Sequence, residues 1–220
     1  MPSAPVDAPW GPMTWPVPPG SELVGSHIRL VPAAPEEHAA GLFRALDTAE
    51  VWTHFGAPRP SSADEAEAGL RLMNADPARE LWIVVAHGSR LGVPPGTVLG
   101  MTSYQDVSVR DARLEIGATA YSPDVWGGAV NPEAKLLLLR HAFEELGCAR
   151  VQFRTDVRNE RSRRAIVGIG ADYEGILRCY ERRLDGTMRD SVVYAVCAAQ
   201  WPGVRELLQK RLEAFSGTAD

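Results

Sequence analysis

Apolar residues recur along the chain in some segments with the spacing typical of strands and in others with the spacing typical of helices. The run Leu81–His87 (LWIVVAH) is almost continuously apolar, which is typical of a strand that is covered on both faces. Strands are predicted at 27–31, 81–87, 97–104, 113–121, 151–155, 172–183 and 191–198, and helices at 35–47, 62–74, 131–146, 159–169 and 202–215.

The order of these elements predicts an α/β fold with a single mixed sheet. A group of strands is followed by alternating helices and strands and then by a hairpin, whose turn is Asp185-Gly186. Such an order places helices on both faces of the sheet. No internal repeat interrupts the pattern, so residues 21–202 are predicted to form one domain, with a C-terminal helix and tail at 203–220.

Residues 1–20 differ from the rest because they hold seven of the 17 prolines. Proline does not propagate a helix and donates no ladder hydrogen bond, so this segment predicts an extended arm. Trp10 and Trp15 are candidate anchors. We hypothesise that the arm docks on the domain or on a neighbouring subunit, which leaves room for a homodimer.

Composition and charge narrow the classes of partner. The net charge of -5 argues against nucleic acid or an anionic membrane as the main partner, because both need a basic excess. Of the 23 basic residues only Lys135 and Lys210 are lysine, which is typical of a GC-rich genome. No apolar run approaches the roughly 20 residues of a membrane span, and no secretory signal begins the chain.

Cysteine and histidine spacings predict neither a disulfide framework nor a metal site. Cys148, Cys179 and Cys197 form no CxxC pair, so reduced thiols in the cytoplasm are expected. The five histidines form no HxxxH or HExxH pair.

The segment Tyr121–Lys135 (YSPDVWGGAVNPEAK) predicts a loop of small residues before a well-capped helix. Asn131 is a favoured N-cap, Pro132 sits where a missing N–H costs nothing, and Glu133 complements the helix dipole. Backbone N–H groups freed by such a loop suit a phosphate or pyrophosphate. A plain strand–helix turn explains the same residues, and the GxGxxG and GxxxxGK[ST] fingerprints are missing.

A second segment, Asn159-Glu-Arg-Ser162, opens the helix that follows the strand at 151–155. Asn159 is a plausible N-cap. Ser162 either donates its hydroxyl to a leaving group or is simply solvated. It is not predicted to be a triad nucleophile, because no nucleophile elbow or paired His and Asp is visible.

Several short motifs, in their order along the chain, resemble those of the GNAT N-acetyltransferase superfamily: LEIG (114–117), W-small-small-small-x-N-x-E-A (126–134), HAFEELG (141–147), NERSRR (159–164) and EG-x-LR (174–178). The closing RDSVVYAV (189–196) and Trp201-Pro202 make the chain similar, more narrowly, to ribosomal-protein N-terminal acetyltransferases of the Rim type. The likeness covers roughly Leu23 to Pro202. The sequence departs from the family's Q/R-x-x-G-x-G/A loop, since Trp126, Ala129 and Asn131 occupy the first and the two small positions.

The resemblance implies a sheet of about seven strands that splays open after Gly117 and admits the pantetheine arm of acetyl-CoA. It implies that the backbone of Thr119, Ala120 and Tyr121 pairs with that arm, and that Asn159 contacts the cofactor. It also implies that the pyrophosphate is held by the amides of Trp126, Gly127, Gly128, Ala129, Val130 and Asn131.

The expected reaction is direct attack of a neutral amine on the acetyl-CoA thioester. It requires deprotonation of an ammonium, donors for the oxyanion and a proton for the departing thiolate. Ser162 is the candidate for the last role. Glu115, through a water, is the candidate base and Asp190 is its competitor, although either carboxylate is as well explained by an ion pair with an arginine.

The acceptor is predicted to be a peptide N-terminus or a small amine such as a polyamine, an amino acid or an aminoglycoside-like compound. Asp64, Glu65 and Glu67 cluster in the second helix, where they would attract a cationic amine or merely form a solvated face. The alternative function is an acyl-CoA-binding sensor or interaction protein with little transferase activity. An unrelated nucleotide-binding domain would need phosphate-loop glycines that the sequence lacks.

Overall fold

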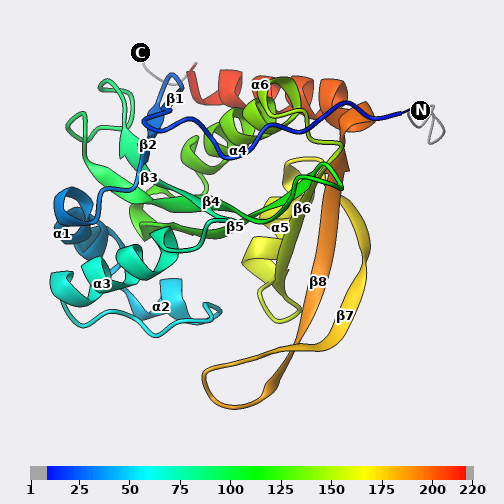
Figure 1. The fold of residues 1–220 in the computed structure, drawn as a ribbon. Coiled ribbons are helices and arrows are strands. Elements are labelled where there is room, and N and C mark those ends of the chain that lie inside the picture. Colours follow the sequence, from blue (N-terminus) through cyan, green and yellow to red (C-terminus); the bar gives the residue numbers. More distant parts are fainter. Residues whose placement is uncertain (1–8, 217–220) are drawn as a thin grey trace.

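One mixed sheet organises the structure, a computed structural model that describes residues 9–216. Its strand order is β1-β2-β3-β4-β5-β6-β8-β7, and all neighbours are antiparallel except β5 and β6 (Figure 1). The strands are β1 Leu23–Val24, β2 Ile28–Pro32, β3 Glu80–Ala86, β4 Val98–Ser108, β5 Arg113–Tyr121, β6 Arg150–Asp156, β7 Asp172–Arg182 and β8 Met188–Cys197. The α-helices are α1 Pro35–Leu46, α2 Ala49–Trp52, α3 Ala63–Asn74, α4 Val130–Arg140, α5 Glu160–Gly168 and α6 Trp201–Ser216.

Helices cover both faces of the sheet, so the expected α/β architecture is confirmed. Leu81, Ile83 and Val85 of β3 face the cluster formed with α1 and α3. Trp82 and Val84, which alternate with them, face the larger cluster that includes α4 and α6. The strand predicted to be covered on both faces is therefore buried on both.

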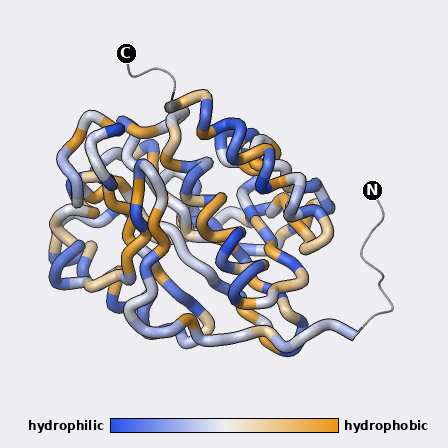
Figure 2. The backbone as a smooth tube through the Cα atoms, turned by 90° about the horizontal axis from the view of Figure 1, so that it is seen from above, coloured by the Kyte–Doolittle hydropathy of each residue, from blue (hydrophilic) through white to orange (hydrophobic). Residues whose placement is uncertain are grey.

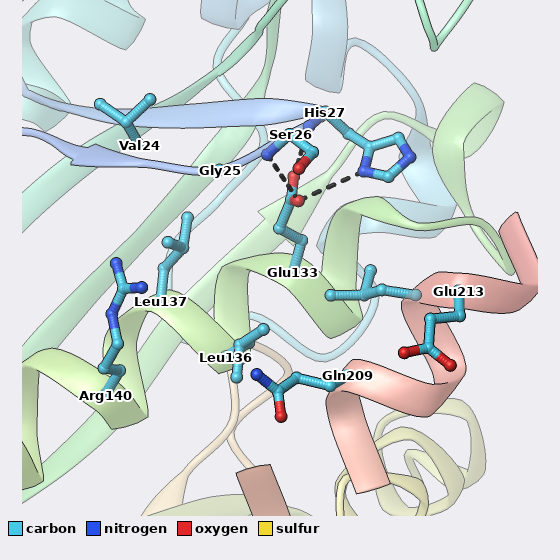
Figure 3. A pocket seen from close by; sticks show the side chains of 11 residues that line it. Val24, Gly25, Ser26, His27, Glu133, Leu136, Leu137, Arg140, Gln209 and Glu213 are labelled. Atoms are coloured by element: carbon cyan, nitrogen blue, oxygen red, sulfur yellow. Dashed lines mark hydrogen bonds and ion pairs between the residues drawn. The ribbon is translucent and has the colours of Figure 1, made fainter. Parts of the chain in front are cut away.

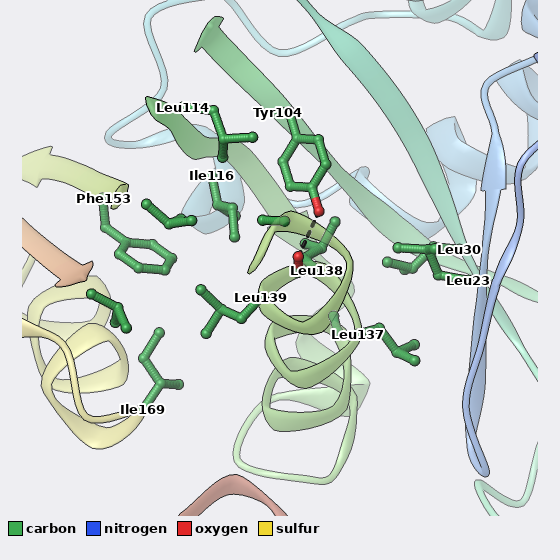
Figure 4. Close-up of a cluster of buried hydrophobic side chains, with 14 of the residues drawn as sticks. Leu23, Leu30, Tyr104, Leu114, Ile116, Leu137, Leu138, Leu139, Phe153 and Ile169 are labelled. Carbon is green, nitrogen blue, oxygen red and sulfur yellow. Dashed lines mark hydrogen bonds between the residues drawn. The ribbon is translucent and has the colours of Figure 1, made fainter. Parts of the chain in front are cut away.

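The larger core lies between the sheet and α4 (Figure 4). Leu137, Leu138 and Leu139 of α4 pack there beside Ile116 and Phe153. The buried hydroxyl of Tyr104 donates a hydrogen bond of 2.5 Å to the Leu138 carbonyl. Such a partner is what a buried phenol requires, and it ties β4 to α4.

All seven predicted strands are present, with one addition and shifted ends. The short strand β1 Leu23–Val24 brings the sheet to eight. The helix predicted at 131–146 consists of α4 and a π-helical turn, His141–Glu145. The predicted hairpin turn at Asp185-Gly186 is confirmed, with Gly186 at a φ of 83°.

The proline-rich arm, from residue 9 onward, runs as an extended segment along the outside of its own domain (Figures 1 and 2). The indole Nε1 of Trp10 donates to the Gly147 carbonyl at 3.0 Å, and that of Trp15 to the Pro77 carbonyl at 3.1 Å. Met13 and Val17 are buried in the larger core. Both tryptophans thus anchor the arm to the domain that carries it.

Glu133 joins α4 to the turn between β1 and β2 (Figure 3). Its buried carboxylate accepts hydrogen bonds from the backbone N–H groups of Ser26, His27 and Ile28 at 2.8, 2.8 and 2.9 Å. A Cβ on Gly25 would lie 2.6 Å from Glu133 Cδ, so the turn requires glycine there. The side chain expected to complement its own helix dipole therefore satisfies three amides of another element.

Glu133→Gln is expected to lower the free energy of unfolding by about 1–3 kcal/mol, because an amide nitrogen would face a buried N–H and leave it unpaired. Urea denaturation followed by circular dichroism measures the change. Glu213→Gln is the matched control, since Glu213 is exposed on α6 near the same turn. Equal losses in both variants would contradict the assignment.

Candidate active site

The central feature of the site is that β5 and β6 pair over only a short stretch. The paired residues are Arg113 with Arg150, Leu114 with Val151 and Glu115 with Gln152, after which the strands separate (Figure 1). The opening expected after Gly117 is thus seen, and pairing ends slightly earlier, at Glu115. The edge of β5 that would face β6 is left open beyond that point.

A β-bulge shapes β5 where it leaves β6. Met101 of β4 pairs with Ala120 and Ser103 with Gly117, so Ala118 and Thr119 together oppose a single residue of β4. Ala118 adopts a φ of 47°, in the left-handed region. Bulges are enriched beside active sites because they redirect side chains and end regular pairing.

A cleft of about 1100 Å³ lies at this opening. One wall is apolar and comes from α1 to α3, with Phe43, Trp52, Phe55 and Met73. Most of the candidate residues line the cleft, namely Glu115, Thr119, Ala120, Tyr121, Trp126, Gly127, Gly128, Asn131, Asn159 and Ser162. Ala129 and Val130 are buried behind the lining, and Asp190 is not part of it.

The loop before α4 presents free amides to this region. In residues 9–216, no acceptor takes a hydrogen bond from the N–H groups of Gly127, Ala129, Val130 or Asn131. The other two amides predicted to hold the pyrophosphate, those of Trp126 and Gly128, already donate to the Pro123 and Val125 carbonyls at 3.1 and 3.4 Å. Trp126 is fixed by a 2.9 Å hydrogen bond from its Nε1 to the Tyr121 carbonyl. Unpaired amides at the start of an 11-residue helix are groups that suit an anion, so the anion site stays a prediction.

The predicted N-cap is wrong. The helix begins at Val130, its N-cap is Ala129, and the Ala129 carbonyl accepts the Glu133 N–H at 3.0 Å. The short helical turn Pro123–Val125 and Gly127, at a φ of 74°, bend the chain before Asn131 is reached. The Asn131 side chain is therefore available to the cleft.

A cation lies beside the same loop. The Arg161 guanidinium carbon is 3.4 Å from the centroid of the Trp126 ring, and Arg161 Nη1 is 3.5 Å from a Glu50 carboxylate oxygen. Arg164 also lines the cleft. Arg161 therefore places positive charge beside the loop, which suits an anionic ligand.

Asn159 and Ser162 are held together at the start of α5. The Asn159 side chain accepts the Ser162 N–H at 3.0 Å, so Asn159 is the helix N-cap as expected. Within the described part of the chain, no hydrogen bond engages the Ser162 hydroxyl. That hydroxyl is therefore free to serve a ligand in the cleft.

Glu115 is a buried carboxylate with three side-chain donors. Oε1 accepts from Gln105 at 2.7 Å, and Oε2 accepts from Gln152 at 3.0 Å and from Arg154 Nε at 2.5 Å. The ion pair considered as an alternative is thus present. A carboxylate offers about four acceptor positions, so one remains on Oε1. A Cβ at Gly117 would lie 2.3 Å from Gln105 Nε2 and 3.1 Å from Glu115 Oε1, so this hydrogen-bonded pair at the cleft requires glycine there.

Asp190 is engaged elsewhere. Its carboxylate accepts the backbone N–H of Cys179 at 2.7 Å, where Cys179 adopts a φ of 49° in an irregular part of β7. The structure therefore brings Glu115 and Ser162 to one cleft and leaves Asp190 outside it.

Two titratable residues of the cleft were missed at the level of sequence. Lys135 of α4 is buried, and burial lowers its pKa to about 7. His54 lines the wall formed by α1 to α3. Burial lowers the pKa of His54, and the nearby charge of Asp156 partly offsets that shift. A lysine placed before four consecutive leucines is the one signal that pointed to Lys135.

Two further properties of the described residues concern metal ions and membranes. They contain no cluster of three or more His, Cys, Asp or Glu side chains that could hold a metal ion. None of their helices has the length and apolar character needed to cross a bilayer.

Comparison with known proteins places these features in a family context. The family described as Acetyltransferase (GNAT) domain matches residues 27–172. The FsC-acetyl coenzyme A-N(2)-transacetylase of Aspergillus fumigatus is 29% identical over 187 residues, which cover 80% of this chain and 76% of that protein. A solved structure from T. thermophilus, described as an acetyltransferase, is 38% identical with a TM-score of 0.79 and covers 90% of this chain and 100% of that one.

A more distant likeness is to Mycobacterium smegmatis RimJ, solved in complex with CoA-disulfide. The TM-score is 0.68 at 18% identity, covering 83% of this chain and 88% of that one. At this identity the similarity is one of fold alone.

Gly127→Ala is expected to weaken CoA binding about tenfold, because a left-handed φ costs a residue with a Cβ roughly 1–2 kcal/mol and the loop would rearrange to avoid it. Isothermal titration calorimetry with CoA measures the change. Gly186→Ala is the matched control, since Gly186 has a similar φ of 83° but lies at the β7–β8 turn. Equal weakening by both variants would show that the loop amides are not the binding site.

Proposed function

Because the chain belongs to the GNAT acetyltransferase family, we propose that it transfers an acetyl group to a primary amine. Members of this family take the acetyl group from acetyl-CoA. The observation that carries the proposal is the cleft between β5 and β6, where free amides, Glu115 and Ser162 lie along one surface. An anion site and candidate proton-transfer groups in one cleft suit acyl transfer better than ligand storage.

The donor would lie across the opening of the sheet. The four unpaired amides of the 127–131 segment and Arg161 would hold the pyrophosphate. Asn131 and Asn159 would add side-chain contacts. The open edge of β5 at Thr119, Ala120 and Tyr121 would pair with the pantetheine arm as an added strand does.

The chemistry would be a direct attack of the neutral amine nitrogen on the thioester carbonyl. A new C–N bond forms, the C–S bond breaks, and the sulfur leaves as a thiolate. Ser162, which lines the cleft, would give that thiolate a proton and would regain one from the acylated nitrogen, which must lose its second proton to become the amide. Glu115 would take the ammonium proton through a water at the open position on Oε1.

The proposed class of acceptor is inferred from the apolar wall of the cleft, which α1 to α3 form. Its aromatic side chains favour an acceptor with an apolar body next to the amine, as a peptide or a substituted small amine has. Of the acidic cluster expected to attract a cation, only Glu65 lines the cleft, and Glu67 pairs with Arg71. The name of the Aspergillus relative specifies acetylation at N(2), which supports a nitrogen acceptor.

The narrower Rim-type assignment, with a protein N-terminus as acceptor, has weaker support, because the likeness to RimJ is one of fold alone. The sensor alternative drew on the altered 126–131 loop and on the tryptophan-bearing arm. Since Trp10 and Trp15 bind the chain's own domain, the arm no longer argues for a partner-binding role.

Thiol release from acetyl-CoA is expected with a panel of peptides and small amines, and not with the same peptides blocked by Nα-acetylation. Ser162→Ala is expected to lower kcat by about 10²–10⁴-fold with little change in KM for acetyl-CoA, because it removes only a proton donor. Tight acetyl-CoA binding without turnover on any amine would favour the sensor function instead.

Glu115→Gln is expected to lower kcat by at least about tenfold, since the amide keeps the shape but cannot take a proton. Asp190→Asn, outside the cleft, is the comparison and is expected to leave kcat nearly unchanged. Steady-state kinetics on the best acceptor, with thermal melting to confirm folding, measures both. A loss below about threefold for Glu115→Gln would remove Glu115 from the scheme.

A further inference from the structure

Lys135 is a buried amine with few partners. Its Nζ lies 2.9 Å from Thr119 Oγ1, which is itself 2.9 Å from Thr102 Oγ1. The Phe153 ring centroid is 5.9 Å from Nζ. Over residues 9–216, no carboxylate pairs with this lysine. An ammonium has three N–H donors, so most of the hydrogen-bonding capacity of Lys135 is unused.

The charged form of Lys135 is costly in the free protein. An ammonium removed from water needs an ion pair or several hydrogen bonds to offset its desolvation. Burial accordingly lowers the pKa of Lys135 to about 7. The amine faces Thr119 of β5 and Phe153 of β6, and Thr102 of β4 lies behind Thr119; none of these side chains titrates. Burial raises the pKa of Tyr121 in the same cleft, so Tyr121 stays neutral.

The position of Lys135 relates it to the donor. It lines the same cleft as Thr119 and Ser162. At a rise of about 1.5 Å per residue, Lys135 lies roughly 7–8 Å along α4 from Val130, where the free amides are. An arm bound at those amides and reaching along the open edge of β5 to Thr119 would pass close to the amine, which lies 2.9 Å from Thr119 Oγ1.

Resting on the proposed function, we propose that Lys135 binds the acetyl donor, its ammonium donating a hydrogen bond to a carbonyl oxygen of the acetyl-pantetheine arm. The arm carries amide and thioester carbonyls, which are the acceptors that the free protein does not offer. Lys135 is thus a ligand-binding residue of the cleft lining, and its buried amine has a function beyond packing in the core.

The hydrogen bond makes binding of the donor depend on protonation. In the free protein near pH 8 the amine is mostly neutral, because its pKa is about 7. A carbonyl acceptor favours the charged form, so the pKa rises in the complex and binding takes up a proton. Below about pH 6 the amine is already charged in the free protein, and the uptake falls toward zero.

Calorimetric titration with acetyl-CoA near pH 8, in two buffers of different ionisation enthalpy, measures the proton uptake. The wild-type chain is expected to take up more than about half a proton per acetyl-CoA bound, and Lys135→Met to lose that uptake. Lys135→Met is also expected to weaken binding roughly 10–100-fold near pH 6, where the wild-type amine is charged. Lys210→Met, at the only other lysine, is the control and keeps the uptake, since Lys210 is exposed and pairs with Glu206.

The outcomes separate this inference from the proposed function. Binding without proton uptake, or equal uptake in the wild type and Lys135→Met, would overturn the inference alone. No binding of acetyl-CoA by the wild type would overturn both. A parallel titration with CoA identifies the oxygen, because uptake with both ligands indicates a pantetheine carbonyl and uptake with acetyl-CoA alone indicates the thioester carbonyl. Thermal melting establishes that Lys135→Met is folded.

Discussion

The site depends on one constraint, the early separation of β5 from β6. Backbone groups inside a sheet need hydrogen-bond partners, so an open strand edge at the centre of a sheet is unfavourable unless another group completes it. Pairing from Arg113 to Glu115 keeps the two halves of the sheet joined at one end. Beyond that end, β5 stays with β4, and Gly100 permits this close approach because a Cβ there would lie 2.1 Å from the Ala120 carbonyl oxygen. The opening is therefore built by the strands themselves.

The wall of the cleft formed by α4 and the loop before it is held in place by a contact that lies outside the cleft. Glu133 binds three amides of the β1–β2 turn, and Gly25 leaves room for its carboxylate. This contact holds the first turn of α4 against the edge of the sheet farthest from β7. Both the free amides of the loop and the amine of Lys135 are carried by that helix or by the residues just before it. A carboxylate outside the cleft thus helps to position the groups proposed to bind the donor.

Sequence patterns predicted the elements that are long enough to show a period. They missed β1 and α2, since two and four residues are too few for a strand or helix pattern to appear. Asn131 had the right residue type for an N-cap, but Gly127 and the preceding turn set the helix start, and such backbone effects are not visible in residue preference. The resemblance supplied the candidates that line the cleft, whereas the donors around Glu115 come from strands that only the fold brings together.

The charges of the cleft bear on how an amine would reach its reactive form. The carboxylates of Glu115 and Glu181 are paired with Arg154 and Arg189, so they leave little negative charge for an incoming cation. Lys135 adds a positive charge to the lining in its protonated form, which is the form proposed for the donor complex. Positive surroundings disfavour an ammonium and lower the pKa of an amine that enters. The overall charge of -5 would still attract a cationic acceptor at long range, while the lining would favour the neutral nitrogen that the proposed reaction requires.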